Sequence, residues 1–330
     1  MRVIQIGSAY VDKADIGFGS IKIAELMDGS PIEVPVCIIQ GVDEGPCLWI
    51  HNGVHGDEYV GAAAIGQLIR DIRPEQLSGS LVLLPMINIQ AYRVGERLTP
   101  QDGIDMNRIW PGASLKDAMH IFAHSELVLN EIVKNILVNA DVVLDVHDGG
   151  KMGRMAPYAT YFKGANEELE QRSQSIAIAS DMEIVWETHS KWVDQKAPGS
   201  FKIQMINANI PSITMESGGE GRLDPAYVGR HYKAFINIMK HLGMLLGEVT
   251  TNPEQILISQ AKWVRATVGG ILRTIVKPLD KIEKGQKIAS VNDLFGQTRV
   301  ELTAPIDGWV LGVRTLGTVA TGQYVANIGQ

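Results

Sequence analysis

The feature that most constrains this fold is an alternation of short apolar runs with longer helical patterns between residues 34 and 215. The runs are rich in β-branched residues and hydrophobic almost throughout, which is typical of strands covered on both faces. The predicted strands are 34–40, 47–52, 81–87, 141–147 and 211–217. The predicted helices are 58–72, 118–139 and 224–246, the last capped by Asp224 with Pro225 at its first position. The pattern therefore predicts a layered α/β fold.

The pattern changes after residue 251, where short strands are punctuated by glycine and proline and no long helical period occurs. We place the boundary within 250–255 and expect two domains, 1–250 and 251–330. The tail resembles the hairpin-and-turn pattern of biotinyl/lipoyl-type β-barrels. Such carriers need an attachment lysine on a tight hairpin, but no lysine follows Lys287 and the equivalent hairpin reads LFGQT (294–298). We therefore expect a small all-β, barrel-like domain with a structural or gating role.

The composition limits which classes of partner the protein can have and which side chains could bind a metal. The formal net charge of −7 argues against nucleic acid or an anionic membrane as the main partner. The chain has no stretch of about 20 apolar residues and no signal-peptide pattern at its start, so we expect a cytoplasmic protein. Cys37 and Cys47 are too few for a cysteine zinc cluster, so a metal would be held by histidine and carboxylate. The oligomeric state stays open.

The most informative segment is HNGVHGDEYVG (51–61), which follows a predicted strand and leads into a helix. Ligands of open α/β sheets bind at the carboxyl ends of strands. His55 and Glu58 lie there, and Gly53 and Gly56 allow the sharp backbone path that aims both side chains at one point. An imidazole and a carboxylate placed in this way suit Zn²⁺.

A second segment of this kind, DVVLDVHDGG (141–150), ends a predicted strand at His147. Two-residue alternation places Asp145 on the same face, where it can hydrogen-bond an imidazole. A single histidine beside glycine is usually a hydrogen-bonded loop residue, but two that both follow apolar strands favour a metal site. His55, Glu58 and His147 would supply three ligands and leave one position for water, as in catalytic zinc sites.

Two further segments carry charged side chains. The polar loop 88–112 holds Arg97, Asn107 and Arg108, donors that suit a carboxylate or a developing oxyanion; the alternative is a solvated loop. Glu216 ends an apolar strand at the same predicted sheet edge as the histidines. It could be the general base of a hydrolase, or instead an N-cap or loop anchor. Serine-hydrolase and nucleotide-binding motifs are absent from the sequence.

Four segments in this order resemble the succinylglutamate desuccinylase/aspartoacylase family of zinc hydrolases, which is related to the zinc carboxypeptidases. They are GVHGDE (53–58), RLTPQDGIDMNRIWPG (97–112), DVHDGG (145–150) and TMESGG (214–219). The resemblance covers roughly residues 34–247 and is greatest for the subgroup that deacetylates N-acetyl-diaminobutyrate in ectoine breakdown. It implies a three-layer, zinc-carboxypeptidase-like α/β domain with a mostly parallel or mixed sheet, followed by the small β domain.

The resemblance also implies roles for individual residues. His55, Glu58 and His147 match the ligands of one zinc ion, and Glu216 matches the general base. Arg97 matches the arginine that holds the oxyanion, although variable spacing in the family leaves Arg93 as an alternative. Asn107 and Arg108 match the pair that grips a substrate carboxylate. Asp148 departs from the small or hydroxyl residue typical of the family, and its carboxylate could hold a substrate ammonium group.

We therefore expect a zinc-dependent hydrolase of linear amides that deacylates a small, anionic N-acyl amino acid. A metallo-carboxypeptidase acting on short peptides could use the same metal and arginine chemistry. The deacylase and the carboxypeptidase would differ in how open the active site is. A β-unit that closes its mouth would admit only small acyl amino acids, whereas an open groove would admit peptides. A non-catalytic metal-binding or ligand-binding protein is the third possibility, but it would need a damaged site, and every motif position is filled.

Overall fold

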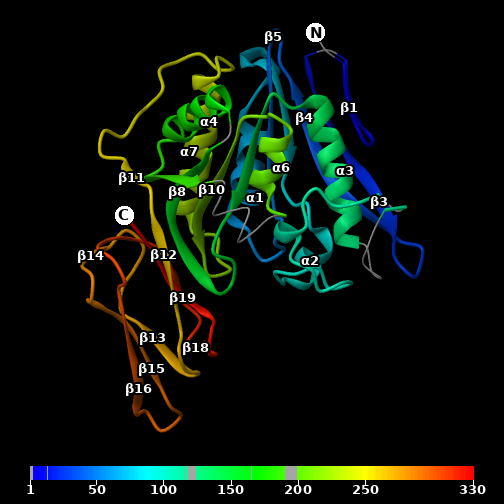
Figure 1. Cartoon of the computed structure of the whole chain (residues 1–330). Coiled ribbons are helices and arrows are strands. Elements are labelled where there is room, and N and C mark those ends of the chain that lie inside the picture. The colour runs from blue at the N-terminus through cyan, green and yellow to red at the C-terminus, as the bar shows by residue number, and fades with distance from the viewer. Residues whose placement is uncertain (1–2, 13, 115, 118–123, 165, 190–198) are drawn as a thin grey trace.

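The computed structural model describes residues 3–12, 14–114, 116–117, 124–164, 166–189 and 199–330. A large mixed sheet runs through it in the order β12-β19-β17-β8-β10-β7-β5-β6-β4-β3 (Figure 1). Its first eight strands in the chain are β3 (Asp15–Glu25), β4 (Pro31–Gln40), β5 (Asp43–Asn52), β6 (Ser78–Leu84), β7 (Val142–His147), β8 (Gly153–Lys163), β9 (Ile184–His189) and β10 (Ser212–Gly219). A separate hairpin, β1 (Ile4–Ile6) with β2 (Ala9–Val11), packs near β3 and β4.

Helices cover both faces of this sheet, as the continuous apolar runs predicted. One face packs against α1 (Val60–Asp71), α4 (Glu167–Ala179) and α7 (Pro225–His241). The opposite face packs against α3 (His124–Asn139) and α6 (Phe201–Asn207). Along β5, Leu48 and Ile50 enter the first core and Cys47 and Trp49 enter the second, so the strand is buried on both sides. The predicted three-layer α/β architecture is confirmed.

The five predicted strands correspond to β4, β5, β6, β7 and β10. The bounds of one of them, β6, are clearly shifted along the chain. We predicted 81–87, but β6 runs from Ser78 to Leu84. Pro85 follows it and cannot donate a backbone hydrogen bond, so pairing stops there although the apolar run continues. The short helix α2 (Ile89–Val94) begins soon after, with the Asn88 side chain accepting from the Ala91 N–H at 3.2 Å.

The helix boundaries also differ from the prediction in places. Helix α7 begins as expected, with the Asp224 side chain accepting from the Ala226 N–H, but it ends at His241 instead of residue 246. Gly243 adopts φ +72°, and the Met244 N–H returns to the Met239 carbonyl at 2.8 Å. This glycine-centred C-cap stops the helix although apolar residues continue. Of the predicted helix 118–139, residues 118–123 lie outside the described residues.

The topology brings the ends of three central strands to one edge. β5 pairs in parallel with β7, and β7 pairs in parallel with β10. Their carboxyl ends therefore lie side by side, which is the edge where ligands bind in open α/β sheets. β8 then pairs with β10 in the antiparallel sense and turns the chain back across this edge.

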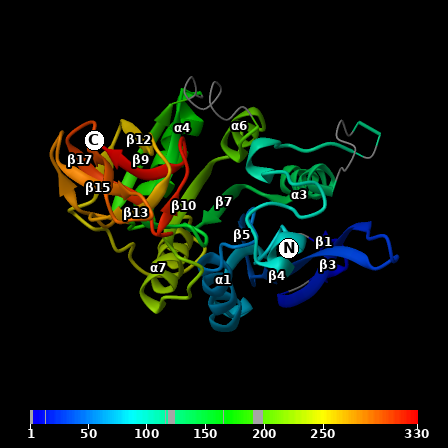
Figure 2. The same ribbon diagram turned by 90° about the horizontal axis from the view of Figure 1, so that it is seen from below.

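The C-terminal strands form a second core and also extend the main sheet. A four-stranded antiparallel sheet contains β13 (Gly270–Thr274), β15 (Lys287–Asn292), β16 (Thr298–Thr303) and β18 (Thr318–Val319). It packs against the remaining C-terminal strands, β12 (Ala261–Arg265), β14 (Lys281–Ile282), β17 (Gly308–Arg314) and β19 (Tyr324–Gly329). Because β17 pairs with β8, these C-terminal strands lie next to β8, at the end of the main sheet that is far from β3 and β4 (Figure 2).

The proposed division at residue 250 remains a prediction. Beyond it, β11 (Ile256–Ile258) adds in parallel to β9, and β17 adds to β8, so both stretches extend the main sheet. No described helix is both long and apolar enough to cross a membrane.

Packing of α7 against the sheet makes a stability prediction. The Phe235 ring is fully buried in the core between α7 and the sheet. Phe235→Ala should lower the free energy of unfolding by about 3–5 kcal/mol, since it removes a large apolar group and leaves a cavity. The control Leu246→Ala, at a side chain that is 99% exposed, should change it by less than about 0.5 kcal/mol. Equal effects in urea unfolding would contradict this account of the core.

Candidate metal centre and active site

The turn after β5 delivers His55 and Glu58 to the sheet edge. Gly53 adopts φ +77°, and an added Cβ there would lie 2.2 Å from the Met86 sulfur. At Gly56 an added Cβ would lie 2.2 Å from the backbone of α2. Both positions therefore need glycine, because this turn passes too close to Met86 and α2 to leave room for a side chain. His55 and Glu58 end up buried, just before α1 begins.

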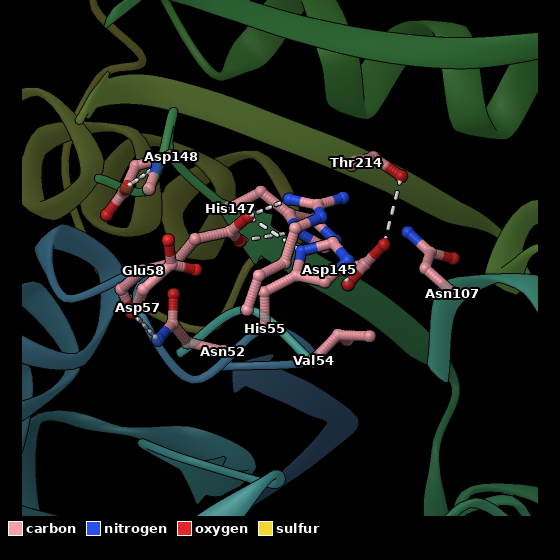
Figure 3. A network of polar contacts seen from close by, with 12 residues as sticks. Asn52, Val54, His55, Asp57, Glu58, Asn107, Asp145, His147, Asp148 and Thr214 are labelled. Carbon is pink, nitrogen blue, oxygen red and sulfur yellow. Dashed lines mark hydrogen bonds and ion pairs between the residues drawn. The ribbon is translucent and has the colours of Figure 1, made fainter. Parts of the chain in front are cut away.

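His147 arrives from the end of β7 and meets the same carboxylate (Figure 3). Glu58 Oε1 lies 2.6 Å from His55 Nδ1, and Glu58 Oε2 lies 2.7 Å from His147 Nδ1. One ligand atom from each of the three residues falls within 4.8 Å of the other two. The structure therefore brings together the three residues that the sequence motifs selected.

The electrostatics of Glu58 fit a metal ligand. Burial alone would raise the pKa of Glu58, but the two imidazoles outweigh it and hold that pKa well below its usual range. Glu58 is therefore ionised, as a carboxylate must be to bind a cation. Two imidazole nitrogens and one carboxylate also form the donor set that zinc accepts in open, catalytic sites.

Two aspartates orient the histidine rings. His147 Nε2 lies 2.9 Å from Asp145 Oδ1, as the two-residue alternation along β7 predicted. His55 Nε2 lies 3.0 Å from Asp105 Oδ1. With each Nε2 facing a carboxylate, each Nδ1 is left to face the metal position, an arrangement common at zinc sites. Sequence reasoning missed Asp105, because a loop 50 residues away along the chain brings it to His55.

The loop after α2 supplies one arginine to this centre. Arg97 Nη1 lies 3.2 Å from Glu58 Oε1, and Arg97 Nη2 lies 3.5 Å from Asp105 Oδ2. Arg93, the alternative left open by the sequence, is exposed in the last turn of α2 and does not line the cavity beside the metal ligands. Of these two arginines, Arg97 is therefore the one that lies beside Glu58 and lines the cavity.

Asn107 and Arg108 lie at the rim of the same cavity, in the short helix η2 (Met106–Arg108). Asn107 Oδ1 accepts from the Phe201 N–H at 3.2 Å, which ties this loop to the start of α6. Arg108 is exposed, with Nη1 donating to the Asn107 carbonyl at 2.8 Å. Its other guanidinium donors make no hydrogen bond to the residues that the structure describes and could bind a ligand in the cavity.

Glu216 on β10 is flanked by His147 of β7 and Tyr158 of β8 in the strand register. Glu216 Oε2 is buried and has no hydrogen-bond partner among the described residues. Burial, together with the charges of Glu58 and Asp148, raises the pKa of Glu216 to about 8. A carboxylate that lines the cavity beside the metal ligands and holds a proton readily can transfer protons there.

Asp148 has a structural role in this geometry. Asp148 Oδ2 accepts from the Val60 N–H at 2.9 Å, and Oδ1 accepts from the Gly150 N–H at 2.7 Å. It therefore caps the start of α1 and holds the turn that carries Glu58 against β7. Each oxygen can still accept a further hydrogen bond, and Asp148 lines the cavity, so its role in holding a substrate ammonium group stays a prediction.

These side chains share a cavity of about 390 Å³, a size that suits a small molecule. Part of its lining comes from residues that sequence reasoning did not identify. They include Lys202 of α6 and Thr160 of β8, and Trp263, Arg314 and Tyr324 of the C-terminal strands. No local motif marks these positions, because they meet only when β17 joins β8 and α6 packs over the sheet.

Comparisons with known proteins agree with this geometry. The chain is 28% identical to the N-alpha-acetyl-L-2,4-diaminobutyric acid deacetylase of Halomonas elongata, over 98% of this chain and 94% of that protein. The product-bound ectoine utilization protein EutE (DoeB) of Ruegeria pomeroyi has the same fold, with a TM-score of 0.86, 24% identity and 96% of each chain covered.

A succinylglutamate desuccinylase/aspartoacylase from Rhodobacter sphaeroides gives a TM-score of 0.84 at 24% identity, over 97% of this chain and 95% of that one. At these identities the two structures show a shared fold. Residues 44–242, more than half of the chain, match the succinylglutamate desuccinylase/aspartoacylase catalytic domain. The chain therefore belongs to the succinylglutamate desuccinylase/aspartoacylase family.

Proposed function

We propose that this protein is a zinc-dependent amidohydrolase that removes a short acyl group from an N-acyl amino acid. The products would be a carboxylate and a free amine. The observation that carries the proposal is that His55, Glu58 and His147 converge beside Glu216, which has an unpartnered carboxylate oxygen among the described residues. The deacetylase activity named for the Halomonas elongata relative supports the same class of reaction.

His55, Glu58 and His147 would hold the metal. When bound, zinc lowers the pKa of a water molecule and polarises the amide carbonyl. Glu216 would accept the proton of the attacking water and deliver it to the leaving nitrogen, so that the amine departs in neutral form. Its raised pKa suits a group that must both accept and return a proton near neutral pH.

Arg97 and the Asn107–Arg108 pair would act on the substrate. The Arg97 guanidinium lies against Glu58 and can donate to the oxygen on which charge develops, a contribution of about 3 kcal/mol in comparable sites. Asn107 and Arg108 at the rim would grip a substrate carboxylate and orient the amide. A small anionic N-acyl amino acid fits these donors.

The shape of the cavity favours a deacylase over a carboxypeptidase. The C-terminal strands β12, β17 and β19 contribute side chains to the cavity that holds the metal ligands. With this wall the cavity has a volume of about 390 Å³, which fits a small acyl amino acid. A purely metal-binding role would not require Glu216 and Arg97 to face the ligands.

The first test of this proposal asks whether His55 is a metal ligand. His55→Ala should empty the metal site, because it removes one of three protein ligands and leaves Glu58 with only His147. The control His241→Ala changes an exposed histidine at the end of α7 and should keep the metal. Metal analysis of both purified proteins decides; full zinc occupancy in His55→Ala would refute the assignment.

Glu216→Gln tests the proton-transfer role. It keeps the size of the side chain but removes the group that accepts the proton, so turnover should fall by about 10²–10⁴-fold with zinc retained. Glu168→Gln, at an exposed position on α4, is the matched control. Release of amine from N-acetyl amino acids is the assay. A near-native rate in Glu216→Gln would remove Glu216 as the base.

The two arginines of the loop region give a paired comparison. Arg97→Ala should lower kcat by about a hundredfold, the cost of losing one oxyanion donor. Arg93→Ala should leave kcat unchanged, because Arg93 is exposed and lies outside the cavity. Zinc content is measured in both variants, since Arg97 also contacts Glu58. The opposite ranking, with zinc present in both, would contradict the assignment.

A further inference from the structure

His51, near the end of β5, is a buried histidine that the proposed mechanism does not use. Its side chain is fully buried. Alternation along β5 places it on the same face as Cys47 and Trp49, which both belong to the apolar core under α3 and α6. An apolar side chain would suit that row, because a buried imidazole is costly unless its nitrogens have polar contacts. The contacts of the His51 ring therefore show what a histidine can contribute at this position.

His51 and His147 face the same carboxylate oxygen. His51 Nε2 lies 3.1 Å from Asp145 Oδ1, and His147 Nε2 lies 2.9 Å from the same atom. The strand register explains this arrangement. His51 pairs directly with Asp145 between β5 and β7, and His147 follows two residues later on the same face of β7. The three side chains therefore form a chain, His51–Asp145–His147, that ends at the metal position.

Asp145 depends on these contacts for its position. Its side chain is only 1% exposed, and a buried carboxylate needs hydrogen-bond donors. The Thr214 hydroxyl donates to Oδ2 at 3.3 Å (Figure 3). Within the part of the chain that the structure describes, Oδ1 is faced by the two imidazoles. Without His51, Oδ1 would keep only the His147 ring, which is the group that Asp145 has to orient.

Two aromatic side chains hold the His51 ring in place. Its centroid lies 5.1 Å from that of Phe201, edge to face, and 5.9 Å from that of the Trp110 ring. Trp110 and Phe201 also pack against each other, with centroids 5.3 Å apart. Of the two His51 nitrogens, Nε2 is the one that lies near a carboxylate among the described residues. The packing therefore directs the polar edge of the ring toward Asp145.

We propose that His51 is a positioning residue for the metal ligand His147 and acts through Asp145. A carboxylate oxygen can only accept hydrogen bonds, so each ring that faces Oδ1 turns a protonated Nε2 toward it. A fixed Asp145 fixes the His147 ring, whose Nδ1 then faces the metal position. The described residues that line the cavity do not include His51, so its effect is on His147 and not on the substrate.

This inference rests on the proposed function, because it takes His147 as a zinc ligand. Zinc affinity, measured by competition with a chelator, is the test. His51→Phe keeps a ring against Trp110 and Phe201 but lacks the N–H. Zinc should therefore bind at least about tenfold more weakly, as when other partners of ligating histidines are lost. His51→Gln places an amide N–H near the position of Nε2 and should restore most of the affinity.

Trp49→Phe is the matched control. Trp49 is fully buried two residues earlier on the same face of β5, and it pairs with Val143 instead of Asp145. This variant should lower thermal stability and leave zinc affinity unchanged. If circular dichroism shows that His51→Phe is unfolded, His51→Met replaces it, since methionine matches glutamine in size and lacks the donor. Wild-type affinity in the donor-free variant, or an equal loss in His51→Gln or Trp49→Phe, would overturn the proposal.

Nitrogen-15 NMR of histidine-labelled protein separates this inference from the proposed function. The spectra show which ring nitrogen carries a proton, and loss of a signal in His51→Gln identifies His51. We expect a proton on His51 Nε2 in both the zinc-free and the zinc-loaded protein. If the wild-type protein binds no zinc, the proposed function fails, but this result would still support the contact with Asp145. A proton on Nδ1 alone would overturn it.

Discussion

The Glu58 carboxylate, held between two imidazoles, is the interaction on which the rest of this site depends. Its two oxygens lie 2.6 and 2.7 Å from Nδ1 of His55 and His147, in a buried position. An isolated carboxylate would be costly there, so the histidines must arrive with it. This requirement explains why three segments pack closely together at this point. They are the turn after β5, the end of β7 and the start of α1.

Much of the surrounding structure holds these three side chains still. Asp145 faces the outer nitrogen of the His147 ring (Figure 3). Asp105 faces the outer nitrogen of the His55 ring, and Asp148 ties the start of α1 to the turn after β7. The Asn52 amide donates to the Glu58 carbonyl at 3.1 Å. Such supports keep the donor atoms converging on one point, which is what a catalytic metal site needs from its protein.

The parts of this site that could be predicted from the sequence are those with local signals. His55 and Glu58 follow an apolar strand, His147 and Glu216 lie near the ends of two others, all four are close to glycines, and these strand ends meet at one sheet edge. Asp145 followed from alternation along β7. Helix ends were less predictable: apolar residues continue past Gly243, and only the left-handed conformation of that glycine shows where α7 stops.

Asp105, Lys202 and Tyr324 had no such signal, because tertiary contacts place them. Asp105 reaches His55 through a long loop, Lys202 is set by the packing of α6 on that loop, and Tyr324 comes from a strand that joins the main sheet through β17. An acidic chain thus encloses a cavity with Arg97, Arg108 and Lys202 on its walls. The overall net charge argued against polyanionic partners, but it did not reveal these cationic side chains within the cavity.

The central claim is that one zinc ion binds at Nδ1 of both histidines and at Glu58. An anomalous difference map from crystals of the purified protein, recorded at the zinc absorption edge, tests it most directly. The account predicts one peak about 2.0–2.1 Å from His55 Nδ1 and from His147 Nδ1, with a Glu58 oxygen at about 2.0–2.2 Å. A peak bound to the outer ring nitrogens or to other residues, or no peak in zinc-loaded crystals, would contradict it.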